Sequence, residues 1–360
     1  MRLTSRWCVI LALLSAIVAG PSETDAACVA DIPTNGIEPG LIVHLPPSCT
    51  PAEREAHAVH GEAIMVAIAK GRTVDLLGVI VRGDLIFDHL AMQKMTPTQV
   101  PAPGRANQGD RGDGNAQRIV RAALSIRDSV VLGAVRHRSA DGMLQFEGPV
   151  NFNGSRFKEG VDLSRSVFHE SVELSEASFE KEAYFLQGQF VRQVSCRETR
   201  FGPSTRFHRS VFHGSMNCTG ALFDGTAEFL EVQFEQSAVF ERSRFGLGTG
   251  FSGSRFKSQV SFRDSIFSRE TFFAFAVFEG EAVFEGGQFL GAADFSQAEF
   301  RQPDDLAKAR FDQPPILSQA KRRDPASSAG FFQTGNGQYA LTLGILIVAA
   351  LLVAYAVKFK

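Results

Sequence analysis

A large apolar residue recurs in alternating steps of six and five residues from Phe146 to Phe300. Twenty-five of the 29 positions in this series are Phe, and the others are two Leu and two Cys. A fixed short period of this kind is typical of a stacked repeat protein. In a helix, steps of five and six residues would rotate the side chain by about 140° and 240°, which would scatter the Phe residues around the axis. The pattern therefore excludes a long helix.

Each large residue follows a small one by two positions, as Phe157 follows Ser155 and Phe179 follows Ala177. Residues two apart point to the same face of an extended strand. Each unit is therefore predicted to turn one small and one large side chain inward, and its polar residues and glycines outward. Met216 is the bulky exception among the small positions, and the residue that follows it in the series is the small Cys218, which compensates the volume.

The double units at 282–289 and 293–300 read AVFEGGQF and ADFSQAEF. They resemble pentapeptide-repeat proteins, in which a small residue, Asp or Asn, Leu or Phe, and two polar residues recur. This chain is similar to a Phe-centred variant with one extra residue in every second unit. The resemblance implies an all-β solenoid, a right-handed quadrilateral β-helix with four units in each coil. Two units of five and two of six residues give a coil of 22 residues.

Positions 22 residues apart are then expected to stack in columns. Two core columns consist entirely of Phe: Phe157, Phe179, Phe201, Phe223, Phe245, Phe267 and Phe289, and Phe168, Phe190, Phe212, Phe234, Phe256, Phe278 and Phe300. A third column contains Cys196 and Cys218 as neighbours among Phe and Leu. This regular β-helix is predicted over residues 146–317.

An N-terminal segment at 28–71 is expected to hold two Cys and a capping helix. Thr50 is a suitable N-cap, Pro51 suits the first helical position, and Glu53 completes a capping box. The helix is predicted to run to about Lys70, and Gly71 ends it. Its Ala-rich sequence suits a lid over the open end of a solenoid, where unpaired strand edges need protection.

Irregular first coils are predicted over 72–145, interrupted by a polar loop at 93–117 that is rich in Pro, Gly and Asn and by a second break at 136–142. A polar tether is predicted at 318–338. Residues 1–27 have the two Arg, the short apolar run and the small residues of an export signal. Lipidation of Cys28 is disfavoured, because Asp25 stands where a lipobox requires Leu.

The apolar run at 339–357 is 19 residues long, and as a helix it would extend about 28 Å, close to the thickness of a bilayer core. Lys358 and Lys360 in the tail at 358–360 favour a cytoplasmic end. The expected topology is a single C-terminal membrane span with the solenoid on the extracytoplasmic, periplasmic side. A removable sorting tail is the alternative, although no clear sorting motif precedes the run.

Four Cys remain after removal of the export signal, and they are disulfide candidates in an oxidising compartment. Cys28 and Cys49 bracket a Pro-rich loop with little core of its own. Cys196 and Cys218 are one coil apart, and stacked strands are about 4.8 Å apart, within the range that a disulfide tolerates. Two reduced thiols that act as small core residues are the alternative for this second pair.

No catalytic, cofactor-binding or metal-binding motif is recognised, and no cofactor is expected. The G-x-G-x-x-G sequence at 248–253 contains Phe251 in register with the repeat, so repeat turns explain it. Residues 146–300 contain 21 Asp and Glu against 15 Lys and Arg, a net charge of −6. No basic stripe indicates binding to nucleic acid. Candidate acids for catalysis face outward: Asp162, Glu173, Asp224 and Asp294.

These observations favour a non-enzymatic, membrane-anchored extracytoplasmic scaffold or binding protein, because a repeat rod presents long flat faces to partners. Its partners would be the membrane and an unidentified protein or component of the cell envelope. A β-helix enzyme that acts on a polysaccharide is the first alternative, and it requires an outward cluster of carboxylates. A DNA mimic that acts on topoisomerase, as the resemblance suggests for cytoplasmic family members, is the second, and it requires a strongly acidic cytoplasmic rod.

Overall fold

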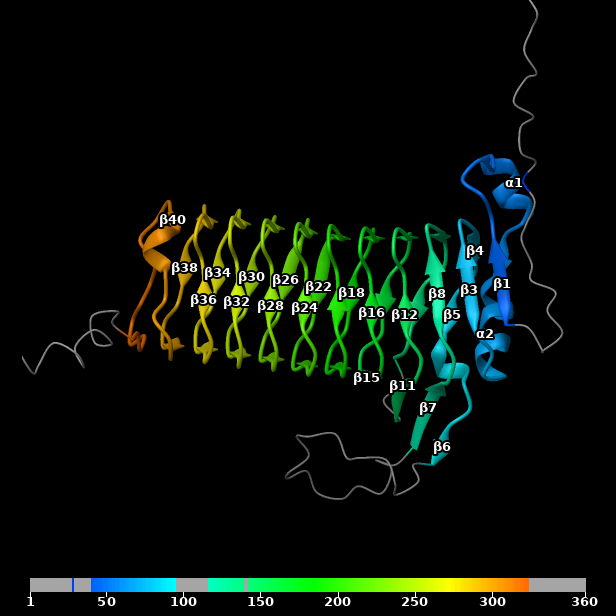
Figure 1. Cartoon of the computed structure of the whole chain (residues 1–360), viewed down its shortest axis with the longest axis horizontal. Coiled ribbons are helices and arrows are strands. Elements are labelled where there is room, and N and C mark those ends of the chain that lie inside the picture. The colour runs from blue at the N-terminus through cyan, green and yellow to red at the C-terminus, as the bar shows by residue number, and fades with distance from the viewer. Residues whose placement is uncertain (1–27, 29–39, 95–115, 139–141, 324–360) are drawn as a thin grey trace, which may run out of the picture.

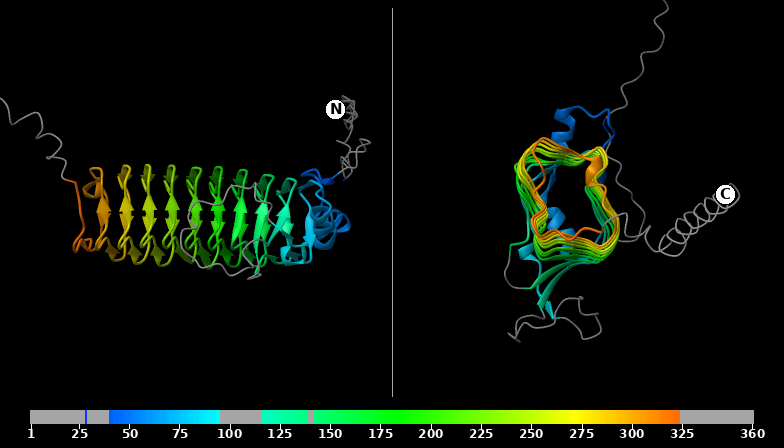
Figure 2. Two further views of the ribbon diagram at one scale, coloured as in Figure 1. Left: turned by 90° about the horizontal axis from the view of Figure 1, so that it is seen from below. Right: turned by 90° about the vertical axis from the view of Figure 1, so that its left-hand side faces the viewer.

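The computed structural model describes residues 28, 40–94, 116–138 and 142–323. They form a rod of about ten stacked turns with about 22 residues per coil, and four parallel β-sheets make its walls (Figures 1 and 2). Viewed along its axis, the rod has a four-sided outline (Figure 2). The predicted all-β solenoid with a 22-residue coil is confirmed.

Each wall receives one strand from each regular coil, and we name the walls A to D in chain order. Wall A contains β1 (Leu41–His44), β3 (Val74–Leu77), β8 (Leu124–Arg127), β12 (Val150–Asn151), β16 (Val172–Glu173), β20 (Val194–Ser195), β24 (Met216–Asn217), β28 (Ala238–Val239), β32 (Val260–Ser261) and β36 (Ala282–Val283). Wall B contains β2 (Val59–His60), β4 (Ile80–Arg82), β9 (Val130–Val131), β13 (Arg156–Phe157), β17 (Ser178–Phe179), β21 (Arg200–Phe201), β25 (Leu222–Phe223), β29 (Arg244–Phe245), β33 (Ile266–Phe267), β37 (Gln288–Phe289) and β40 (Arg310–Phe311).

The other two walls are built in the same way. Wall C contains β5 (Leu85–Ile86), β10 (Val135–Arg136), β14 (Val161–Asp162), β18 (Ala183–Tyr184), β22 (Ser204–Arg206), β26 (Thr226–Glu228), β30 (Thr249–Gly250), β34 (Thr271–Phe272) and β38 (Ala293–Asp294). Wall D contains β6 (Gln93–Lys94), β7 (Ala116–Val120), β11 (Met143–Phe146), β15 (Ser166–Phe168), β19 (Gln189–Phe190), β23 (Val211–Phe212), β27 (Gln233–Phe234), β31 (Arg255–Phe256), β35 (Val277–Phe278) and β39 (Glu299–Phe300).

The predicted Phe columns fill the interior. Phe201, Phe223 and Phe245 stack in sequence, with ring centroids 4.8 and 4.9 Å apart and nearly parallel planes. Stacked rings throughout the columns have centroids 4.5 to 5.4 Å apart, which is the spacing that hydrogen-bonded strands impose. All Phe residues of the two predicted all-Phe columns are buried. Their inward assignment is therefore confirmed.

Small polar residues fit into this apolar interior because their hydroxyls have fixed partners. Ser243 donates its hydroxyl proton to the backbone carbonyl of Cys218 at 2.7 Å, and Thr199 donates to that of Leu174 at 2.7 Å. Both partners lie 25 residues earlier in the chain, at a corner of the preceding coil. A buried hydroxyl with a hydrogen bond avoids most of the cost of losing water, so Ser and Thr serve as well as Ala at the small positions.

The start of the rod differs from the prediction. The capping box of Thr50 and Glu53 is present, but the helix that it begins, α1 (Pro51–Ala56), ends after six residues. Val59 and His60 then pair with β4 in wall B, and a second helix, α2 (Gly61–Ala69), follows. A single helix up to Lys70 is therefore wrong, because the backbone pairing in wall B prevails over helix propensity between the two halves.

Helix α2 occupies the place that wall C and wall D strands would take in the first coil. Its Ile64 and Ile68 are buried in the same core cluster as the Phe columns. The first strand of that coil, β1, was missed by the sequence analysis, which placed 28–71 outside the solenoid. Its pairing with β3 joins Leu41 to Val74, a separation of 33 residues that no repeat period indicates.

Both irregular insertions enter at the corner between walls C and D. The first carries the chain from β5 to β7, and the second from β10 to β11. Strands β6 and β7 pair antiparallel, so the ends of the predicted polar loop at 93–117 are strands, whereas 95–115 lie outside the described residues. Together β6, β7 and β11 form a wing that extends beyond the wall (Figure 1). The second break begins after β10, because Arg136 is still paired in wall C.

The rod also extends slightly beyond its predicted end at residue 317. Ser318 accepts a hydrogen bond from the backbone of Gln297 at 2.8 Å. Lys321 forms a parallel bridge with Glu299 in wall D. Residues 318–321 therefore belong to the last coil rather than to the tether, whose remainder from residue 324 lies outside the described residues.

Candidate functional site

Two disulfides join the four candidate Cys residues. Cys28 is bonded to Cys49 with a Cα separation of 5.0 Å, immediately before helix α1. The Arg54 side chain supports this region, since it donates hydrogen bonds to the carbonyls of Cys49 at 3.1 Å and Pro46 at 3.0 Å. Arg54 thereby fixes the turn between Pro46 and Cys49 beside helix α1.

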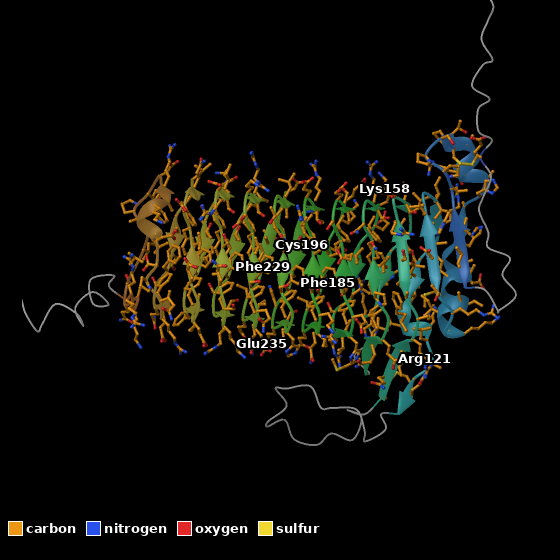
Figure 3. All side chains as sticks on the ribbon, in the orientation of Figure 1. Arg121, Lys158, Phe185, Cys196, Phe229 and Glu235 are labelled. Atoms are coloured by element: carbon orange, nitrogen blue, oxygen red, sulfur yellow. A yellow bond between two sulfur atoms is a disulfide. The ribbon has the colours of Figure 1, made fainter. Side chains whose placement is uncertain are left out.

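The second disulfide joins Cys196 to Cys218 in neighbouring coils of wall A, with a Cα separation of 4.4 Å. Both residues are completely buried, and Figure 3 shows Cys196 in the interior of the rod with Phe185 and Phe229. Met216, which stands in the adjacent column of small positions, is also buried, at 1% exposed. The bond therefore replaces ring stacking at one level of the core.

Many ion pairs on the outer surface of the rod join side chains of neighbouring coils. In wall D, Glu235 accepts hydrogen bonds from Lys257 at 2.7 Å and from His213 at 2.8 Å. The hydrogen bond from Lys257, followed by that from His213, holds the pKa of the Glu235 carboxyl below its usual range. Further pairs of this kind are Lys158–Glu180, Arg200–Asp224, Arg209–Glu231, Arg255–Glu279 and Arg263–Glu285.

Each such exposed pair contributes at most about 1 kcal/mol to stability, but the pairs matter for the charge pattern. They place a cation beside many of the surface carboxylates, so acidic side chains do not form a long unbroken stripe on the described walls. This arrangement does not favour a DNA mimic, which needs a continuous acidic surface.

The outward acids that the sequence singled out are not brought together. Asp162 and Asp294 lie in wall C but in distant coils, Glu173 lies in wall A, and Asp224 follows β25 of wall B. Burial alone raises the pKa of Glu173, yet no second acid of this set shares its wall. General acid–base hydrolysis of a polysaccharide requires two carboxylates within about 10 Å, so these four residues do not form such a site.

The sequence analysis missed a buried histidine, His137, at the base of the wing. It stands in a core column between Phe87 and Leu163, and its side chain is fully buried. Asp88 lies 3.0 Å from its Nδ1 atom and also accepts a hydrogen bond from the backbone of Arg138. Burial lowers the pKa of His137, Asp88 opposes this effect, and the nearby guanidinium groups of Arg118 and Arg165 lower the pKa further.

Because the pKa of His137 is lower in the folded than in the unfolded protein, the unfolded chain takes up a proton first as the pH falls. Stability should therefore decrease as the pH falls through about 6.5, the ordinary value for histidine, and should level off below the folded pKa. We expect Tm to fall between pH 7.5 and pH 5.5. The His137→Leu variant, which matches Leu163 in the next coil, should lose most of this dependence. An equal fall of Tm in both proteins would refute the role of His137.

Within residues 28, 40–94, 116–138 and 142–323, no group of three His, Cys, Asp or Glu side chains is arranged to hold a metal ion. The same part of the chain has no helix that is long and apolar enough to cross a membrane. The predicted export signal at 1–27, the membrane span at 339–357 and the tail at 358–360 all lie outside the described residues.

Comparison with known proteins identifies the repeat. The profile of the family described as pentapeptide repeats (9 copies) matches residues 163–211 and 219–266. These two blocks lie within the regular part of the rod, where every coil has the 22-residue spacing. No curated protein matches the chain. Residues 163–211 and 219–266 of the rod are therefore similar to the pentapeptide repeats of this family.

Proposed function

We propose that this protein is a non-enzymatic scaffold, anchored in a membrane by residues 339–357, whose rod lies outside the cytoplasm and binds a partner through its walls. The observation that carries the proposal is the pair of disulfides, one of which is buried in the rod. Disulfides are common in exported proteins and rare in the cytosol of most organisms. The export signal predicted at 1–27 and the apolar run at 339–357 agree with this location.

The walls supply the surface that a scaffold needs. Between β12 and β36, the outward column of wall A is mainly uncharged. Its partly exposed members are Asn151, Ser195, Asn217 and Val239, with Glu173 as the charged one, whereas Ser261 and Val283 are 5% and 6% exposed and so buried. Walls B and D present paired charges instead. In this proposal helix α2 serves as the N-terminal cap, which leaves the walls as the binding surface.

A topology experiment tests the location. A reporter that is active only in the cytoplasm, fused after Lys360, should be active, whereas a reporter that requires export should be inactive there. The rod should be digested or labelled when protease or a membrane-impermeant reagent is added to spheroplasts. A variant that lacks residues 1–27 is the matched control, and it should keep its rod inside and protected. Protection of the full-length rod, or activity of the export-dependent reporter after Lys360, would contradict the proposal.

A further inference from the structure

Two Phe residues of wall C depart from the pattern of the core. Phe272 is 44% exposed and Phe275 is 57% exposed, and no other Phe among the described residues is classed as exposed. Leu247, 46% exposed, precedes β30 at the corner between walls B and C, and Ile316, 45% exposed, pairs with Asp294 at the end of wall C. The strand register connects Gly250 to Phe272, Phe272 to Asp294, and Asp294 to Ile316. We call Leu247, Phe272, Phe275 and Ile316 the apolar patch.

The backbone at Phe275 shows that this patch is not needed for the fold. Phe275 has a φ of 60°, in the left-handed region, which is costly for a bulky side chain. The same corner position in other coils is occupied by polar residues or Gly: Arg209, Glu231, Gly253, Gln297 and Gln319. The left-handed conformation is a repeated feature of this corner, and what distinguishes Phe275 is an exposed aromatic ring that does not contribute to the core.

The coil that precedes Phe272 and Phe275 does not cover their rings. Gly250 and Gly253 occupy the positions that correspond to Phe272 and Phe275, so that coil offers no side chain there to cover the rings. Leu230 reaches over Gly250, since its Cδ2 atom would lie 2.8 Å from a Cβ at that position. Leu230 therefore lies beside Gly250, one coil step before Phe272.

The size of the patch limits its occupant. It covers three steps between coils, about 14 Å at a strand spacing of about 4.8 Å. A stable interface between free proteins buries about 800 Å² on each partner, which is more than four partly exposed side chains provide. A segment attached to the same chain needs much less contact area, because tethering raises its effective concentration to the millimolar range. The patch therefore suits a tethered occupant.

The chain itself contains a segment close to the apolar patch that could occupy it. The described residues end at Arg323, after Lys321 has bridged to Glu299 in wall D. Gln319 stands in the corner position of Phe275, two coils later, so the end of the rod is about 10 Å from the patch. The segment 324–338 follows, and its large apolar residues are Phe331 and Phe332. Eight residues in extended conformation reach about 26 Å, which is ample for this distance.

We infer that residues 324–338 fold back on wall C and that Phe331 and Phe332 pack against the apolar patch. The partner is apolar and aromatic, as the patch is, and the segment carries one charged residue, Asp324. An anionic lipid surface fits less well, because Glu228 precedes Gly250 in the same outward column and Asp294 stands between Phe272 and Ile316. This contact does not depend on the membrane anchor, and it would fix the direction in which the chain leaves the rod.

Photocrosslinking in the full-length protein tests the contact. A benzoylphenylalanine residue replaces Phe272 or Phe275 in turn, and mass spectrometry locates the crosslink after irradiation in intact cells. We expect crosslinks to a peptide from 324–338. A mixture of isotope-labelled and unlabelled protein shows whether both ends belong to the same chain. The same crosslinker at Val191, an exposed residue that follows β19 of wall D, is the control and should not reach this segment.

The variant Phe331→Ser/Phe332→Ser should reduce the crosslink about tenfold or more and should make 324–338 more sensitive to protease, without changing Tm by more than a few degrees. Crosslinks to lipid, to another protein or to a second copy would overturn the inference, and so would a lack of any crosslink or an unchanged yield in the variant. The topology experiment measures the location of the rod and does not depend on this contact. A wrong prediction of the membrane anchor can therefore be distinguished from a wrong prediction of the contact.

Discussion

Replacing Phe223 by Ala should lower the free energy of unfolding by about 3–5 kcal/mol, the typical cost of truncating a buried Phe. Phe223 is 1% exposed and lies between the stacked rings of Phe201 and Phe245, with Phe229 edge-on at 6.0 Å. The cavity cannot close easily, because backbone hydrogen bonds between coils hold the strands at a fixed spacing. Urea denaturation of the wild-type and variant proteins measures the difference.

Two controls make this result specific. Gln236→Ala changes an exposed residue between β27 and β28 and should alter stability by less than about 0.5 kcal/mol. Phe223→Leu keeps most of the apolar volume and should cost considerably less than Phe223→Ala. Similar losses from Phe223→Ala and Gln236→Ala would show that the columns are not the main source of stability.

Replacing Cys196 and Cys218 together by Ala should lower the free energy of unfolding by about 3 kcal/mol. The bond closes a loop whose ends are 22 residues apart, and its removal both frees the unfolded chain and leaves a cavity between the coils. The measurement is urea denaturation with and without a reductant. The wild-type protein should lose stability in the reductant, whereas the double variant should respond only through Cys28–Cys49.

Mass spectrometry of non-reduced peptides from protein in its exported location provides the direct control. A peptide that contains both Cys196 and Cys218 through a bond should be recovered. Free thiols at both positions, or equal stability of the wild-type protein with and without reductant, would contradict a stabilising disulfide. The corresponding variant Cys28→Ala/Cys49→Ala separates the contribution of the N-terminal bond.

The regular coils could be predicted because one physical pattern repeats without interruption. A small and a large residue two apart define the inward face, and the 22-residue spacing then places Cys196 beside Cys218. The first coils could not be predicted in the same way. Strand β1 has no neighbour at a repeat distance, and the pairing of Val59 with Val81 breaks a sequence that otherwise suits one helix. Backbone pairing between distant segments determines both strand β1 and the break between the two helices, and such pairing leaves little trace in the local sequence.

The candidate surfaces were less predictable than the core. His137 was missed because a polar residue in a core column does not fit an apolar pattern. Its position 26 residues before Leu163 was an indication, because Val135 and Val161 pair in wall C at the same separation. Phe272 and Phe275 fall between the positions of the Phe series, which continues through Phe273 and Phe278. A large apolar residue at an outward position was therefore the indication that the sequence offered for the apolar patch.

The orientation of the strands determines how this rod would respond to force. The strands run across the long axis of the rod, so the hydrogen bonds between coils lie along this axis. A force that pulls the two ends of the rod apart would therefore break these hydrogen bonds one coil at a time. Cys196–Cys218 joins adjacent coils in the middle of the stack by a covalent bond. Tension passes through that bond instead of through the 22-residue coil between its ends. The coil between the two Cys residues would therefore carry no load, and the length of chain released as the rod unfolds under force would be shorter by that coil.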